Sequence, residues 1–137
     1  KYGKLTPGRL CSVMLGVPVE DMVHVRLEGD IVYGEVEGAK LLLDQWTPKD
    51  RPPGAPLGRV FLYLHGGGWI QGDKRSHSFP LLVGMARAGW TVISPNYRVS
   101  RTDFKRRSSG ATFPDHLHDC LRALAWARGR GATAVVV

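Results

Sequence analysis

The 137-residue sequence lacks several features that define common classes of protein. Its only cysteines, Cys11 and Cys120, are too few for the disulfide framework of a small secreted domain. We therefore predict two free thiols, a reducing compartment and a cytoplasmic location. No apolar run approaches the roughly 20 residues that a transmembrane helix needs, so the sequence predicts no membrane-spanning segment.

Acidic residues are scarce beside basic ones, with 12 Asp and Glu against 19 Lys and Arg and a formal net charge of +7. Part of this excess lies between Arg101 and Arg107, where four basic residues accompany one acidic residue. A basic segment can bind nucleic acid. However, this one holds a single aromatic residue, Phe104, and no recognisable nucleic-acid-binding module surrounds it. We expect a solvated loop and no nucleic-acid partner.

Motifs for metals and nucleotides are incomplete. The segment 115–120 contains every type of metal-ligating side chain, but on a helix His116 and His118 would lie about 200° apart. A phosphate-binding P-loop requires a lysine where Asp73 stands, and a dinucleotide fingerprint requires a third glycine where Gln71 stands. We therefore predict no metal and no organic cofactor.

Hydrophobic patterning predicts alternating strands and helices after an irregular or short-helical lead-in at residues 1–22. Strands are predicted at 23–27, 30–34, 38–46, 60–64, 90–94 and 133–137, and helices at 79–88 and 112–127. Continuous apolar strands that alternate with helices indicate an α/β fold, with a mainly parallel sheet and flanking helices.

The second helix carries two local signals. Thr112 and Asp115 have the spacing of a capping box, which predicts that the helix begins at Thr112. Apolar residues then recur at helical spacing and are predicted to face the core as one stripe: Leu117, Cys120, Leu121, Leu124 and Ala125.

The most distinctive stretch is Val60 to Trp69, in which five apolar or aromatic residues run into a histidine and three glycines. The unbroken apolar run predicts a strand buried on both faces. The glycines permit a turn that bulkier residues cannot follow, with backbone N–H groups free to face a ligand. Fixed backbone dipoles of this kind can stabilise an oxygen that becomes negative during a reaction.

This His-Gly-Gly-Gly motif resembles the oxyanion-hole loop of lipases and esterases. The segment Asn96-Tyr97-Arg98, and Phe113-Pro114 before an acidic helix, resemble the same group of enzymes. The sequence is thus similar to the α/β-hydrolase fold, in particular to carboxylesterases related to hormone-sensitive lipase and to formamidase-like esterases. The resemblance covers residues 23–137 and implies the N-terminal half of such a domain, with the earliest strands opening the sheet as an antiparallel pair.

The resemblance also implies roles for residues of the motif. Gly67 and Gly68 would donate their backbone N–H groups to the oxyanion. His65 would support the loop by hydrogen bonding and would not be the catalytic base. Trp69 would pack beside the loop or line an acyl pocket, and Asp73 would be either a brace or an exposed turn acid. The residues predicted to support the loop are therefore His65, Gly66, Trp69 and Asp73.

A hydrolase of this type also needs a serine in Gly-x-Ser-x-Gly, followed by an acid and a histidine. None of the seven serines has that setting, so we expect the sequence to stop before this nucleophile elbow. The resulting hypothesis is the N-terminal part of a serine carboxylic ester hydrolase for a small-molecule ester, inactive without the catalytic Ser, acid and His. Alternatives are an arylformamidase-like hydrolase, a non-catalytic binding protein on the same scaffold, and a truncated gene product.

Overall fold

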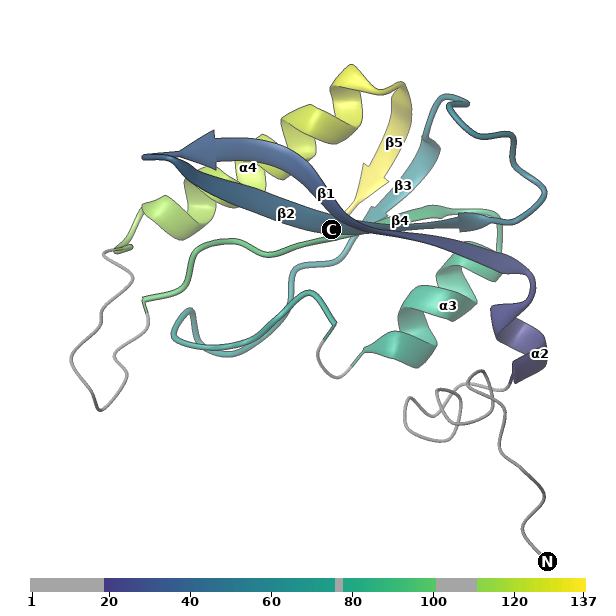
Figure 1. Ribbon diagram of the computed structural model, residues 1–137, viewed down its shortest axis with the longest axis horizontal. Helices are drawn as coiled ribbons and strands as arrows, with labels where there is room; N and C mark the ends of the chain where they lie inside the picture. The colour runs from purple at the N-terminus through teal and green to yellow at the C-terminus, as the bar shows by residue number, and fades with distance from the viewer. Residues whose placement is uncertain (1–18, 76–77, 101–110) are drawn as a thin grey trace, which may run out of the picture.

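The computed structural model describes residues 19–75, 78–100 and 111–137 as one sheet with helices on both faces (Figure 1). The strands are β1 (Val25–Val36), β2 (Ala39–Pro48), β3 (Gly58–Leu62), β4 (Thr91–Pro95) and β5 (Ala132–Val136). The helices are α2 (Val19–Met22), α3 (Phe79–Arg87) and α4 (Asp115–Gly129). None of these helices is long and apolar enough to cross a membrane. The basic segment 101–110 and Cys11 lie outside the described residues.

The five strands form a mixed sheet in the order β1-β2-β4-β3-β5. β2 is antiparallel to both β1 and β4, whereas β3 is parallel to both β4 and β5. The predicted antiparallel opening is therefore confirmed. The two early strands predicted at 23–27 and 30–34 are one strand, because the expected turn is a register shift between Glu28 and Ile31 with a φ of 58° at Asp30.

The central position predicted for the apolar run is confirmed, since β3 lies between β4 and β5, but the strand covers residues 58–62 and not 60–64. The two faces of the sheet carry separate apolar cores, because consecutive strand residues point to opposite sides. Val60 and Ile93 pack with Ala123 of α4 on one face, and Val92 and Trp46 pack with α3 on the other. Figure 1 shows α4 and α3 on these opposite faces.

The apolar stripe predicted on α4 is wrong, because Leu117 and Leu121 are 49% and 50% exposed. The residues that α4 buries are His116, Asp119, Ala123 and Ala127. Burial of an acid is tolerated here because the Asp119 carboxylate accepts hydrogen bonds from Arg98 Nε at 2.8 Å and Nη2 at 3.1 Å. Alanine on the same face allows the helix to pack closely on the sheet.

The start of α4 also differs from the prediction. The helix begins at Asp115 with Pro114 in the N-cap position, and no side-chain cap forms there. One half of the expected capping box is present, since Oδ2 of Asp115 accepts a hydrogen bond from the backbone N–H of Thr112 at 2.9 Å.

Two substitutions on α4 test which of its faces is buried. Ala123→Leu should destabilise the protein by about 1–3 kcal/mol, because the added carbons enter a filled core. Leu121→Ala should change the free energy of unfolding by less than about 0.5 kcal/mol, because the side chain lies on the surface. Urea unfolding of both variants measures the two values, and a larger cost for Leu121→Ala would contradict the assigned orientation.

Because β3 and β4 are parallel, their carboxyl ends lie at the same edge of the sheet. The glycine-rich segment follows β3 at this edge, and the segment Asn96-Tyr97-Arg98 follows β4. In open α/β sheets this edge is where ligands bind.

Candidate functional site

The glycine loop, residues 65–75, leaves the carboxyl end of β3 and folds back on itself. The N–H groups of Ile70 and Gln71 both donate to the carbonyl oxygen of Gly67, over 3.2 and 3.3 Å. Gly67 and Gly68 have φ angles of 131° and 62°. The loop therefore passes through conformations that favour glycine over residues with a side chain.

Glycine is needed at two positions for space and at a third for conformation. A Cβ atom at Gly67 would lie 2.0 Å from the carbonyl oxygen of Gln71, and one at Gly72 would lie 2.3 Å from Nδ1 of His65. A Cβ at Gly68 would meet nothing within 4 Å, but a φ of 62° strains any residue with a side chain. The glycines thus define the path of the backbone.

His65 is buried at the start of the glycine loop, with 3% of its surface exposed. Its ring stacks on that of Tyr97 at 4.2 Å between centroids, and the Tyr97 hydroxyl donates to the His65 carbonyl oxygen at 2.5 Å. Nδ1 of His65 lies 2.9 Å from the carbonyl oxygen of Gly66. These contacts favour loop support by His65 over a role as catalytic base.

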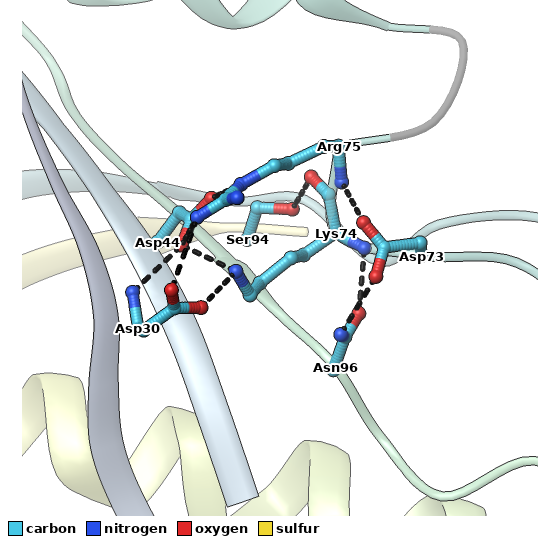
Figure 2. Close-up of polar contacts among 7 residues, drawn as sticks. All are labelled: Asp30, Asp44, Asp73, Lys74, Arg75, Ser94 and Asn96. Atoms are coloured by element: carbon cyan, nitrogen blue, oxygen red, sulfur yellow. Dashed lines mark hydrogen bonds and ion pairs between the residues drawn. The ribbon is translucent and has the colours of Figure 1, made fainter.

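Side chains from the exit of β4 hold the other end of the glycine loop (Figure 2). Oδ1 of Asn96 accepts a hydrogen bond from the Lys74 N–H at 2.6 Å, and Nδ2 of Asn96 donates to Asp73 at 2.9 Å. The Ser94 hydroxyl donates to the Lys74 carbonyl oxygen at 2.7 Å. Asp73 also accepts from the N–H of Arg75 at 2.9 Å, so its contacts favour the brace over the exposed turn acid.

A cluster of charged side chains lies beside this end of the loop and consists of Asp30, Asp44, Lys74 and Arg75 (Figure 2). The Lys74 ammonium, on a side chain only 4% exposed, lies 2.6 Å from a carboxylate oxygen of both Asp30 and Asp44. Nε of Arg75 donates to the other oxygen of the fully buried Asp44 at 2.6 Å. The cluster ties the loop to β1 and β2. Sequence reasoning missed it, although an aspartate inside the apolar strand 38–46 was a signal.

The environment of Asp44 keeps it ionised. Burial alone would raise the pKa of its carboxyl, but the hydrogen bonds from Arg75 and Lys74 outweigh burial and hold the pKa below the ordinary value of 3.8. Because the folded-state pKa is the lower one, ionised Asp44 stabilises the fold above its unfolded pKa of about 4. This stabilisation is lost as the pH falls through the lowered folded-state pKa.

Asp44→Asn should therefore be most damaging near neutral pH. Removing one partner of a buried ion pair costs about 3–5 kcal/mol, because the other charge is left uncompensated. We expect the difference in free energy of unfolding between native chain and variant to be constant above about pH 5 and to shrink as the pH falls below about 4. Urea unfolding between these conditions measures the difference, and a difference that does not change with pH would contradict the assignment.

An apolar cavity of about 540 Å³ adjoins the glycine loop. Its lining comes from the glycine loop, from Phe113 just before α4 and from the first turns of α4, and includes Gly68, Trp69, Ile70, Leu117 and Cys120. Trp69, at 63% exposure, thus takes the position of a pocket-lining residue and is not buried in the core. No Asp, Glu, Lys or Arg belongs to the lining in the part of the chain that the structure describes.

Polar side chains in the cavity wall are already engaged with protein groups. The two ring nitrogens of His116 lie 2.6 Å from the Arg98 carbonyl oxygen and 3.0 Å from the Ser100 hydroxyl, which donates to the Ala111 carbonyl oxygen at 2.7 Å. Burial raises the pKa of the Cys120 thiol to about 11, so the thiol stays protonated at neutral pH. Residues 19–75, 78–100 and 111–137 contain no group of three or more His, Cys, Asp or Glu that could hold a metal ion.

Comparison with known proteins assigns the chain to a family. Residues 43–134 match the family model BD-FAE. LipM of Mycobacterium tuberculosis, a probable carboxylic ester hydrolase, is 36% identical over 123 residues. The chain belongs to the α/β-hydrolase carboxylesterases. The match to LipM covers 90% of this chain but 25% of LipM. Esterase LipQ of the same organism is 38% identical over 101 residues, and this match covers 72% of this chain and 21% of LipQ. The chain spans a quarter or less of these curated relatives.

Solved structures agree with this family. A bacterial heroin esterase superposes on this chain with a TM-score of 0.64 and 28% identity, over 92% of this chain and 38% of the other. A brefeldin A esterase, a bacterial homologue of human hormone sensitive lipase, superposes with a TM-score of 0.62 at 23% identity, over 83% of this chain and 31% of the other. The predicted α/β-hydrolase fold and the relation to carboxylesterases are confirmed.

Proposed function

We propose that this carboxylesterase-family chain supplies the oxyanion-stabilising part of a serine carboxylic ester hydrolase, with Gly67 and Gly68 as backbone donors. One observation carries the proposal. Neither N–H group donates a hydrogen bond to any residue within the described ranges, although both belong to a tight loop and Gly68 lines the apolar cavity. An N–H group that the fold leaves unpaired is available to a ligand oxygen.

The chemistry follows from where charge develops. When a serine oxygen adds to an ester carbonyl, the C=O π bond breaks and its electron pair moves to the carbonyl oxygen. Fixed N–H donors stabilise that negative oxygen more than they stabilise the neutral carbonyl, and they act strongly in an apolar site. The serine, acid and histidine of the reaction would come from outside these 137 residues, because none of the seven serines here lies in Gly-x-Ser-x-Gly.

The cavity limits the substrate that the site would accept. Its lining contains apolar side chains and engaged polar groups, and no Asp, Glu, Lys or Arg of the described residues contributes to it. Burying a charged substrate group there would be costly. We therefore propose a small-molecule ester with an uncharged, apolar group beside the carbonyl. We also propose that residues 23–137 form a partial catalytic domain and that 1–22 are a lead-in.

A chimera tests this proposal. In it, the chain replaces the matching segment of esterase LipQ, so that the rest of LipQ supplies the remaining catalytic groups. We expect saturable hydrolysis of p-nitrophenyl butyrate, with intact LipQ as the positive control. A chimera that folds but does not hydrolyse the ester would contradict the proposal. Turnover of an N-formyl arylamine in place of the ester would indicate the formamidase alternative, and binding of the ester without turnover would indicate a binding protein.

A further inference from the structure

We propose that Asn96 and Tyr97, consecutive residues at the exit of β4, are positioning residues that hold the two ends of the glycine loop. By holding both ends they would set the direction of the Gly67 and Gly68 N–H groups. The inference rests on the proposed function for its catalytic consequence, but the positioning itself can be measured without any substrate.

Tyr97 fixes the start of the loop. Its ring lies against the ring of His65 with 10° between their planes, and its hydroxyl donates to the His65 carbonyl oxygen at 2.5 Å. This carbonyl belongs to the peptide plane that joins His65 to Gly66. Holding the oxygen therefore holds the plane from which the glycines continue. Tyr97 is itself buried, with 7% of its surface exposed.

Asn96 fixes the end of the loop. Its side-chain amide uses its oxygen to accept from the Lys74 N–H at 2.6 Å and its nitrogen to donate to Asp73 at 2.9 Å (Figure 2). The backbone of Asn96 is anchored in turn to the sheet, because its N–H donates to the Leu42 carbonyl oxygen at 2.8 Å. Lys74 is thereby linked to β2 through Asn96.

The hydrogen bonds inside the loop are longer than these anchors. The bonds from Ile70 and Gln71 to the Gly67 carbonyl oxygen measure 3.2 and 3.3 Å, at the long end of the normal range. Among the described residues, the only other backbone hydrogen bond to the glycine loop is the one that the Ser100 N–H donates to the Trp69 carbonyl oxygen at 2.7 Å. The geometry of the loop therefore depends on contacts from outside it, and those of Asn96 and Tyr97 are among them. A displacement of about 1 Å in a catalytic group can lower a rate by about 10²-fold.

Tyr97→Phe and Tyr63→Phe form a matched pair for the test. Each removes one hydrogen-bonded tyrosine hydroxyl and keeps the ring, but the Tyr63 hydroxyl pairs with Ser78 and not with the glycine loop. In the 137-residue chain, ¹⁵N relaxation should give order parameters for Gly67 and Gly68 of about 0.85 in the native sequence, falling below about 0.6 in Tyr97→Phe. Tyr63→Phe should leave them unchanged. Unchanged order in Tyr97→Phe, or an equal loss in both variants, would overturn the inference.

The LipQ chimera adds a readout that a general loss of stability would not produce. Tyr97→Phe should lower kcat by about tenfold with KM within about twofold, and Asn96→Ala should act in the same direction from the other end of the loop. Tyr63→Phe should leave kcat and KM within about twofold of the native chimera. If the native chimera is inactive, the proposed function fails while the relaxation data still decide the positioning. If it is active and Tyr97→Phe changes neither kcat nor loop order, the inference alone fails.

Discussion

In the LipQ chimera, replacing Gly67 by alanine should lower kcat by about 10²–10³-fold while KM changes by less than about threefold. A Cβ atom at this position would lie 2.0 Å from the carbonyl oxygen of Gln71, so the loop must move to admit it. Movement redirects the N–H groups of Gly67 and Gly68. Because the oxyanion carries more charge than the ester carbonyl, the loss falls on the transition state and therefore on kcat.

Two other glycines supply controls for this variant. A Cβ at Gly66 would meet nothing within 4 Å, so any support of the loop by Gly66 does not require the absence of a side chain. Gly66→Ala should therefore keep kcat within about twofold of the native chimera. Gly68→Ala should lower kcat by more than Gly66→Ala and by less than Gly67→Ala. There is space for the methyl group, but a φ of 62° costs a residue with a side chain about 1–2 kcal/mol. A rise in KM with unchanged kcat in Gly67→Ala would show that the loop binds substrate without stabilising the transition state.

The 137-residue chain on its own should hydrolyse p-nitrophenyl butyrate no faster than a protein-free buffer. A serine hydroxyl attacks poorly without a base to take its proton, and loss of the nucleophile or base of a catalytic triad lowers kcat by about 10⁶-fold. No serine of this chain lies in Gly-x-Ser-x-Gly. A serine-reactive phosphonate should therefore leave the mass of the purified chain unchanged, while it should label the LipQ chimera.

Covalent labelling of the isolated chain, together with saturable turnover, would contradict this expectation. Ser100 would then be the first residue to locate by mass spectrometry, because its hydroxyl lies 3.0 Å from a ring nitrogen of His116 beside the apolar cavity. In the structure that hydroxyl donates to the Ala111 carbonyl oxygen, which is why we do not expect it to act as a nucleophile.

Features that depend on neighbours in the sequence could be predicted. The apolar run at 60–64 indicated a central strand because helices cover both faces of a parallel sheet, so that consecutive residues of such a strand are apolar. The three glycines indicated a turn because only their backbone freedom suits it. The antiparallel opening of the sheet was expected from the resemblance to α/β-hydrolases and not from a local pattern.

Features that depend on distant partners could not be predicted. Burial of Asp44 and Asp119 depends on Lys74 and Arg98, which lie far away in the sequence. Helical periodicity on α4 was misleading for the same reason. Apolar spacing cannot show that Leu117 lines a cavity while a paired acid and alanines face the core. The anchors of the glycine loop at the exit of β4 were missed because no local pattern reports a contact between two loops.

The central claim is tested most directly by a crystal structure of the LipQ chimera after reaction with paraoxon. The phosphoryl oxygen of the adduct takes the place of the oxyanion. The account predicts that this oxygen lies about 2.7–3.1 Å from the backbone nitrogens of both Gly67 and Gly68. An adduct on the serine whose phosphoryl oxygen points away from both nitrogens, with the glycine loop in the conformation described here, would contradict it.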